Sequence, residues 1–431
     1  MPDIPAIVRI LIIFVLILIA IKRNWMLGNA FLGGALGLGL MFAMGPAAIG
    51  RSFMASMTQP KTLSLTVIVG LILVLSHSLE RSGQMARLLD SFKGLLRWPR
   101  VNLVIFPALI GLLPMPGGAI FSAPMVKNIG QDHQLSGAHL SYINYWFRHI
   151  WEYWWPLYPG ILLTTALAGV DLWRLVFFTL PLTLVAVTAG YWPLRGAVLD
   201  GHKVPTDDGP AAKLAGPFLR NLAPIGFVIF GGLGLGLAFS AWLSGPMSAV
   251  AKELGLIIAL IVAIFWIWRR NAMDWHQRWH IVAQPAMLKM LYMVAAILLF
   301  KGILEDSGAV GQISREMMQR HIPLMPICML LPFLVGGVAG ITIAFVGATF
   351  PILITLIQAL GQNHLMLPYM MLALASGFAG VLLSPLHLCL LLSNEYFETS
   401  LASVYRHMRV PVAVLLLATV VYFTILRYAL G

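Results

Sequence analysis

The chain has 431 residues, of which 59% are hydrophobic and only 10% are charged, and its mean hydropathy is +0.87. Soluble domains carry about 25% charged residues, so this composition excludes a soluble protein with a solvated surface. The net charge of +12 could suggest nucleic-acid binding, but in so apolar a chain it indicates basic cytoplasmic loops between membrane spans. We therefore expect a lipid bilayer, and no nucleic acid, among the partners.

The first half of the chain consists of apolar segments separated by polar or Pro/Gly-rich stretches. Segments of this length can cross a hydrocarbon core of about 30 Å. We expect spanning helices at 7–21, 27–44, 63–79 and 173–195. Before the last of these lie two apolar segments that Pro and Gly interrupt, 101–126 and 142–167.

The second half repeats this order. Its predicted helices are 218–241, 254–268, 288–304 and 410–428, and its interrupted segments are 326–358 and 366–393. The halves also share residues, because Leu-Glu-Arg-Ser-Gly at 79–83 matches Leu-Glu-Asp-Ser-Gly at 304–308. The polar segment 196–217 is predicted to be a cytoplasmic linker between two repeats, 1–195 and 218–431.

The number of crossings predicts the relative orientation of the two halves. If the first interrupted segment of each half is a re-entrant hairpin, each half crosses the membrane five times, and an odd number inverts the second half relative to the first. With both termini outside, Lys and Arg favour the inner side by about two to one. The predicted fold is therefore an all-α polytopic membrane protein of two inverted-topology repeats, each with five transmembrane helices, a re-entrant hairpin and a broken helix. We expect it in a bacterial inner membrane with both termini periplasmic.

Two glycine-rich stretches, 113–124 and 336–351, lie inside the first interrupted segments. The first places two prolines and two glycines within five residues, which breaks a helix. Such backbone is tolerated at membrane depth where protein buries it or water reaches it, and we expect hairpin tips whose free N–H groups face an anionic substrate. A kinked helix or a surface loop would also explain the first stretch, and close helix packing would explain the second. The predicted substrate-binding residues here are Gly117, Gly118, Ser122, Thr342, Gly347 and Thr349.

An aromatic-rich run, 144–160, carries the charged side chains of the broken segment in the first half. Arg148 and Glu152 are four residues apart, so on a helix they would share a face and could pair. Charges in a spanning segment usually face a cavity or one another. We expect Asn144 and Arg148 to bind substrate, and His149 and Glu152 to bind a coupling proton. Alternatively, the run is an interfacial aromatic belt with Arg148 reaching toward the headgroups, or Arg148 pairs permanently with Glu152.

The matching segment of the second half is interrupted next to Ser384 and His387. We expect Ser384 at the substrate site. The imidazole of His387 can change charge near neutral pH, which makes it a further proton-coupling residue; the alternative is a packed, hydrogen-bonded helix partner. Cys328 and Cys389 show no metal-ligand spacing, so the sequence predicts no metal site and no cofactor beyond H⁺ or Na⁺ as a coupling ion.

With these hairpins and broken segments in place, the chain resembles the ion-transporter superfamily, which includes the citrate, dicarboxylate and gluconate permeases. The Leu-Pro-Met-Pro-Gly-Gly tip and the Trp-rich segment with Arg148 are similar to one uncharacterised integral-membrane family within it. The resemblance implies an elevator-type secondary transporter, often a homodimer. Dicarboxylate members bind substrate and Na⁺ through Ser-Asn-Thr motifs at the tips, whereas this chain has Pro-Gly-Gly at 116–118 and Gly-Ile-Thr at 340–342. That difference favours protons.

These features together predict a secondary active transporter, not an enzyme, that moves a small organic anion coupled to H⁺ or Na⁺. A channel or lipid scramblase could use the same broken helices to line a conducting path. An intramembrane enzyme acting on a lipid-linked substrate could use Glu152 and His387. A membrane subunit without transport activity is a further alternative.

Overall fold

The computed structural model describes residues 4–92, 99–115, 117–131, 135–195, 211–244, 248, 250–319 and 323–430, and every regular element in these ranges is a helix. Eight helical segments within them are long and apolar enough to cross a membrane. The protein is therefore an all-helical, multi-pass membrane protein, as the composition predicts. Of the predicted linker, 196–210 lies outside the described residues, and 211–217 forms the start of a helix.

The helices of the first half follow the predicted order with two short additions. They are α1 (Ala6–Lys22), α2 (Leu27–Met41), α3 (Pro46–Thr58), α4 (Pro60–Arg81), α5 (Gln84–Phe92), α6 (Pro99–Gly111), α7 (Ala119–Gln131), α8 (Gly137–Arg148), α9 (Pro159–Ala168), α10 (Leu172–Thr179) and α11 (Pro181–Gly190). The short helices α3 and α5 are additions to the sequence prediction. Proline at the first helical position, as in α4 and α9, has the φ angle that a helix needs and no N–H to leave unpaired.

The second half follows the same order of elements, with a single last helix where the first half has α10 and α11. Its helices are α12 (Ala211–Trp242), α13 (Ala251–Arg270), α14 (Trp275–Val282), α15 (Pro285–Asp306), α16 (Ala309–Gln319), α17 (Leu324–Ala339), α18 (Thr342–Ala359), α19 (Met366–Leu382), α20 (Leu388–Tyr396) and α21 (Leu401–Leu430). The short helix α16 is the counterpart of α5 and is also an addition to the prediction. The short helix α14 lies between the second and third long helices of this half, α13 and α15.

The shared Leu-Glu-x-Ser-Gly motifs form the same structure in both halves. Each ends a long helix, α4 or α15, and turns the chain into a short one. Gly83 and Gly308 adopt φ angles of +67° and +68°, in the left-handed region that favours glycine. The hydroxyls of Ser82 and Ser307 donate to the carbonyl oxygens of Leu79 and Leu304, at 3.2 and 3.0 Å.

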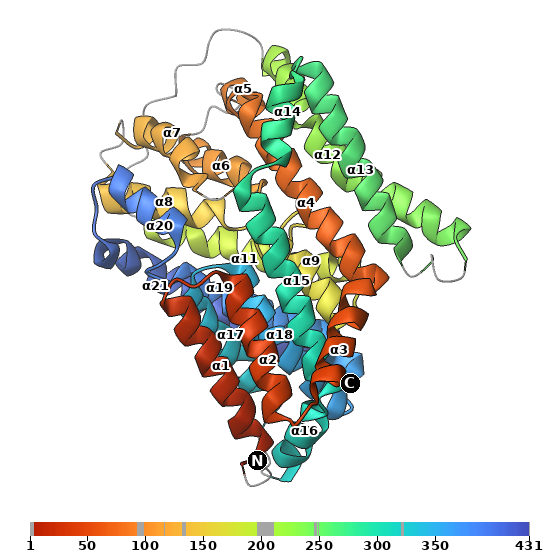
Figure 1. Ribbon diagram of the computed structural model, residues 1–431. Helices are drawn as coiled ribbons and strands as arrows, with labels where there is room; N and C mark the ends of the chain where they lie inside the picture. Colours follow the sequence, from red (N-terminus) through yellow and green to blue (C-terminus); the bar gives the residue numbers. More distant parts are fainter. Residues whose placement is uncertain are drawn as a thin grey trace.

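Two helical hairpins and two broken helices pack against one another in one group (Figure 1). α6 and α7 form the first hairpin, and α17 and α18 form the second. α8 and α9 are the halves of the first broken helix, and α19 and α20 are those of the second. The first hairpin packs on α8 and α20, whereas the second packs on α9 and α19. Each hairpin therefore contacts one half of each broken helix.

Most of the remaining long helices lie on one side of this group (Figure 1). α12 and α13 pair along one edge and contact α4 and α5, while α2 and α3 pack on α15 (Figure 1). The apolar stretches of α18 and α19 are almost wholly buried, whereas only 33% and 28% of the α12 and α21 stretches are buried. Exposed apolar side chains on outer helices suit contact with lipid, because hydrocarbon does not penalise them.

Candidate functional site

The breaks in the two broken helices and the turns of the two hairpins come together inside this group. α8 ends at Arg148, and His387 is the residue that precedes α20. The turns between the hairpin helices contain Gly117 and Gly340, with φ angles of +72° and +65°. The sequence favours these breaks, because glycine tolerates the left-handed region and proline, as at Pro159, is well suited to the first position of a helix. Pro116, within the first tip, lies outside the described residues.

Arg148 lies deep in the protein, with 3% of its surface exposed. Its Nη2 donates a hydrogen bond to the carbonyl oxygen of Met115 in the first hairpin tip, at 2.6 Å. Within the described chain, its Nε and Nη1 atoms have no hydrogen-bond partner. The guanidinium lies against Gly118, where a Cβ would come within 2.6 Å of Nη2. Glycine at this position lets the charged group reach the tip and leaves two donors available.

Arg9, which is also buried, provides a contrast. Its Nε, Nη1 and Nη2 donate to Ile4 O, Met41 O and Gln312 Oε1, respectively, and its guanidinium stacks on the Phe42 ring. Arg9 is therefore a satisfied structural residue that joins α1 to α16. Buried donors normally have partners, so the two unpartnered donors of Arg148 distinguish it.

Glu152 does not share a helix face with Arg148, because α8 ends at Arg148 and the chain then turns. The expected i,i+4 geometry is thus wrong. The Glu152 carboxylate accepts a hydrogen bond from the hydroxyl of Thr342, 2.8 Å from Oε2, and its Oε1 lies 3.6 Å from His149 Nε2. Thr342 is the first residue of α18, so this bond joins the second hairpin to the first broken helix.

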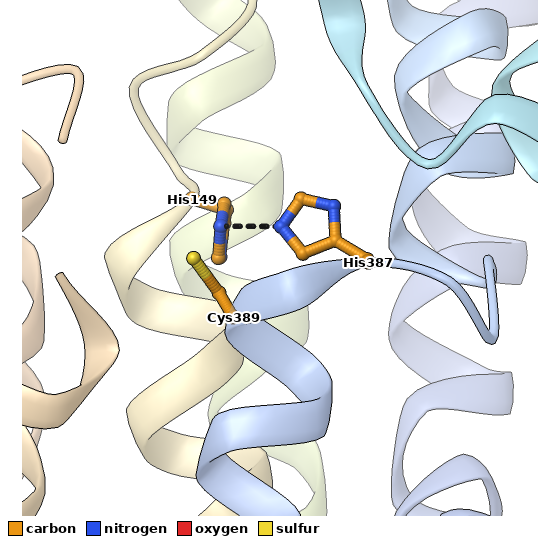
Figure 2. A group of neighbouring side chains, drawn as sticks. All are labelled: His149, His387 and Cys389. Atoms are coloured by element: carbon orange, nitrogen blue, oxygen red, sulfur yellow. Dashed lines mark hydrogen bonds between the residues drawn. The ribbon is translucent and has the colours of Figure 1, made fainter. Parts of the chain in front are cut away.

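Two histidines and a cysteine from the two broken helices face one another (Figure 2). The Nε2 atoms of His149 and His387 are 3.1 Å apart. Cys389 Sγ completes a group of three potential ligand atoms that all lie within 4.8 Å of one another. All three residues are buried, so water does not compete freely for these groups.

A hydrogen-bond network fixes the first hairpin to the broken helices. Ser122 donates to Asn144 Oδ1 at 2.6 Å, and Asn144 Nδ2 donates to Ala119 O and to Ser393 Oγ, each at 2.9 Å. The structure thus brings the predicted site residues Ser122 and Asn144 together. Because these bonds use both the oxygen and the nitrogen of the Asn144 amide, Asn144 holds the first hairpin tip in place near Arg148.

The other predicted site residues have mainly structural contacts. A Cβ on Gly347 would come within 2.5 Å of Ile297, so this glycine allows α18 to pack on α15. Thr349 donates to the Phe345 carbonyl of its own helix at 2.8 Å. Ser384 Oγ accepts from the backbone N–H of Leu386 at 3.3 Å and shapes the break between α19 and α20. Gly347 and Thr349 therefore do not join the group around Arg148.

Cys389 is the site residue that sequence reasoning missed. Its spacing from Cys328 gave no motif, and the histidines that face it come from different broken helices. The signal in the sequence was local: His387 and Cys389 are two residues apart at the start of α20.

These features define a multi-pass helical membrane protein in which two hairpins and two broken helices enclose a buried arginine, a glutamate, two histidines and a cysteine. The chain belongs to the DUF401 family, described as "Protein of unknown function", which matches residues 7–425. Comparison with curated proteins gives no match. Among solved structures, the chain is similar to the YdaH transporter of Alcanivorax borkumensis, whose crystal structure is described as revealing an unusual topology. The identity is 16% over 91% of this chain and 89% of that one, with a TM-score of 0.49.

Proposed function

We propose that the protein is a secondary active transporter of a small organic anion, and that Arg148 binds the anion. The observation that carries this proposal is the buried guanidinium with two unpartnered donors at a hairpin tip. A buried charge is costly unless it is paired. Arg148 interacts electrostatically with Cys389, Tyr158 and Glu152, but an anion that accepts a charge-assisted hydrogen bond from Nε or Nη1 would satisfy a donor that has no partner in the described part of the protein.

The arrangement of the hairpins and broken helices supports a transporter over an isolated binding protein. Both halves follow the same order of elements, and each hairpin contacts one half of each broken helix. Secondary transporters built from inverted repeats bind their substrates at such helix breaks, near the middle of the membrane. In this proposal, the hairpins and broken helices move together as an elevator against the surrounding helices. The sequence resemblance to the ion-transporter superfamily suggests the same mechanism.

The proposal includes coupling to H⁺ or Na⁺, an inner-membrane location with both termini periplasmic, and a homodimer. The distribution of Lys and Arg supports the orientation. The resemblance to the superfamily supports the dimer. Imposing an H⁺ gradient and a Na⁺ gradient separately identifies which of the two ions drives transport.

The test is transport by purified protein in liposomes, followed by solid-supported-membrane electrophysiology. Mono-, di- and tricarboxylates are applied with and without Na⁺ and at two pH values. Counterflow of a labelled anion is measured in parallel, because electroneutral exchange produces no current. The expected result is saturable transport of one anion class, driven by a gradient of one coupling ion.

Arg148→Ala is expected to abolish anion binding and transport. Arg148→Lys retains the positive charge but lacks the planar guanidinium with its several N–H donors. Arg9→Ala is the matched control, because it removes a buried arginine whose donors all have partners. It should lower stability without changing the apparent anion affinity of the folded fraction. Non-saturating currents would favour a channel, and unchanged anion affinity in folded Arg148→Ala would refute the role of Arg148.

A further inference from the structure

The His149–His387 contact raises a problem of hydrogen positions. His149 Nδ1 lies 2.6 Å from the Tyr145 carbonyl oxygen, and His387 Nδ1 lies 2.8 Å from the Gly340 carbonyl oxygen. A carbonyl oxygen only accepts, so both Nδ1 atoms must carry hydrogen. In two neutral imidazoles, both Nε2 atoms then carry lone pairs. These lone pairs face each other across 3.1 Å.

Two facing lone pairs repel unless a cation lies between or beside them. A metal ion bound to both Nε2 atoms removes the conflict directly. Metal-bound histidines usually donate their other N–H to a backbone carbonyl or a carboxylate, which fixes the tautomer and the ring orientation. Tyr145 O and Gly340 O fill this role for the two rings. The second shell of a metal site is therefore present for both histidines.

The separations fit a tetrahedral ion of zinc type. With Zn–N distances of about 2.0–2.1 Å and a Zn–S distance of about 2.3 Å, two ligand nitrogens lie about 3.3 Å apart and nitrogen and sulfur about 3.6 Å apart. Here the two nitrogens are 3.1 Å apart, and Cys389 Sγ lies within 4.8 Å of both. To complete three bonds, the two nitrogens would separate by about 0.2 Å and the sulfur would approach them by at most about 1.2 Å.

Glu152 is positioned to supply the fourth bond. Its Oε1 lies 3.6 Å from His149 Nε2, while its Oε2 is held by the hydroxyl of Thr342. A thiolate and a carboxylate together neutralise a divalent ion, which a buried site requires. Imidazole and thiolate are ligands that suit zinc, and a thiolate disfavours Mg²⁺ and Ca²⁺.

We propose that His149 Nε2, His387 Nε2 and Cys389 Sγ bind one divalent ion of zinc type, with Glu152 Oε1 as the fourth ligand. Binding forms a metal–sulfur bond as the Cys389 S–H bond breaks, and the proton leaves to solvent without any change in oxidation state. The ion would join the C-terminal end of α8 to the start of α20. This proposal does not depend on the transported substrate.

The test is metal binding by the purified, full-length protein. Bound metals are measured by inductively coupled plasma mass spectrometry after growth with added Zn²⁺. The protein is then stripped with a chelator and titrated with Zn²⁺ or Co²⁺. The expected result is one ion per chain, a thermal stabilisation that increases with free Zn²⁺, and a thiolate-to-cobalt charge-transfer band with Co²⁺.

Matched variants separate this site from other sulfur and histidine groups. Cys389→Ser should lose the charge-transfer band and weaken binding by about tenfold or more, whereas Cys328→Ser, at the other buried cysteine, should change neither. The rings of His276 and His280 lie next to each other on α14 and could hold adventitious metal. The double variant His276→Ala/His280→Ala is therefore the second control and should retain the band.

Two results would overturn the proposal. The first is wild-type protein that binds less than a tenth of an equivalent of Zn²⁺ and shows no thermal shift, in which case a shared proton would hold the histidine pair. The second is a cobalt spectrum that Cys389→Ser leaves unchanged. If the Cys389→Ser protein does not fold, ¹¹³Cd NMR of the wild type gives the same answer, because the shift of the bound ion reports whether sulfur is a ligand.

Discussion

Gly118→Ala tests whether the position of the Arg148 guanidinium, and not only its charge, determines anion binding. An alanine Cβ at this position would lie 2.6 Å from Arg148 Nη2 and 2.7 Å from Cζ. Carbon–nitrogen contacts shorter than about 3.4 Å are repulsive, so the guanidinium must move by about 0.8 Å. Gly118 does not have a positive φ angle, so alanine fits the backbone and the effect falls on the side chain.

The expected loss follows from the hydrogen bonds that this movement disturbs. The Arg148–Met115 bond, now 2.6 Å, would lengthen, and the Nε and Nη1 donors would shift relative to a bound carboxylate. A hydrogen bond to a charged group contributes about 1.5–3 kcal/mol. Weakening one such bond to the anion raises its Kd by roughly 10- to 100-fold.

The assay is anion affinity in liposomes or by thermal shift, with Gly337→Ala as the control. A Cβ on Gly337, in the second hairpin, would meet its nearest atom at 3.8 Å, an ordinary contact. The control should therefore bind anions as the wild type does. If Gly118→Ala binds within twofold of the wild type while Arg148→Ala does not bind, the position of the guanidinium against the tip is unimportant and the reasoning is wrong.

Three further predictions concern stability in detergent. Thr342→Val removes the hydroxyl that donates to Glu152 and should destabilise by about 1.5–3 kcal/mol; Thr342→Ser should retain most of the melting temperature, and equal losses in both variants would contradict this role. Gly336→Ala places a Cβ 2.1 Å from the Gly377 carbonyl oxygen, and this overpacking should cost about 1–3 kcal/mol, seen as a lower melting temperature than that of Gly337→Ala. Burial opposes ionisation of Asp171, but the hydrogen bond and charge of Lys252, together with hydrogen bonds from the backbone at Arg174 and Trp173, outweigh it and lower the pKa of Asp171. The pair with Lys252 therefore stabilises the fold above the unfolded-state pKa and loses this contribution as the pH falls through the lowered pKa. Lys252→Met should therefore cost about 0.2–1 kcal/mol near neutral pH and nothing in acid, and a difference that persists in acid would show that lost packing is responsible.

The sequence predicted the long helices and the four interruptions because each has a strong local cause. Hydrophobic runs mark the helices, and clusters of proline and glycine mark the breaks. The helices α3, α5 and α16 were missed for a physical reason. They are short, and α5 and α16 are amphipathic, with average hydrophobicity near that of a loop, so a search for apolar runs passes over them.

The candidate site was predicted less completely than the fold. Arg148, His149 and Glu152 were predicted from one segment, whereas Thr342 and His387 were predicted separately from two others, and the structure brings the three segments together. Spacing along one segment gave the wrong geometry for Arg148 and Glu152, because the helix ends between them. The role of Gly347 in packing and the position of Cys389 depend on contacts between the two halves. Local spacing contains no information about such contacts.

The crossed packing of the hairpins has a consequence for the history of the chain. Each hairpin contacts one half-helix encoded in its own half of the gene and one encoded in the other. A polypeptide holding only one half would thus present an incomplete site, with a hairpin packed on a single half-helix. An ancestor of half this length could have formed the whole site only by pairing with a second copy of itself. Fusion of two such copies would have made that partnership permanent and would have allowed residues such as Arg148 and Cys389 to differ between the halves.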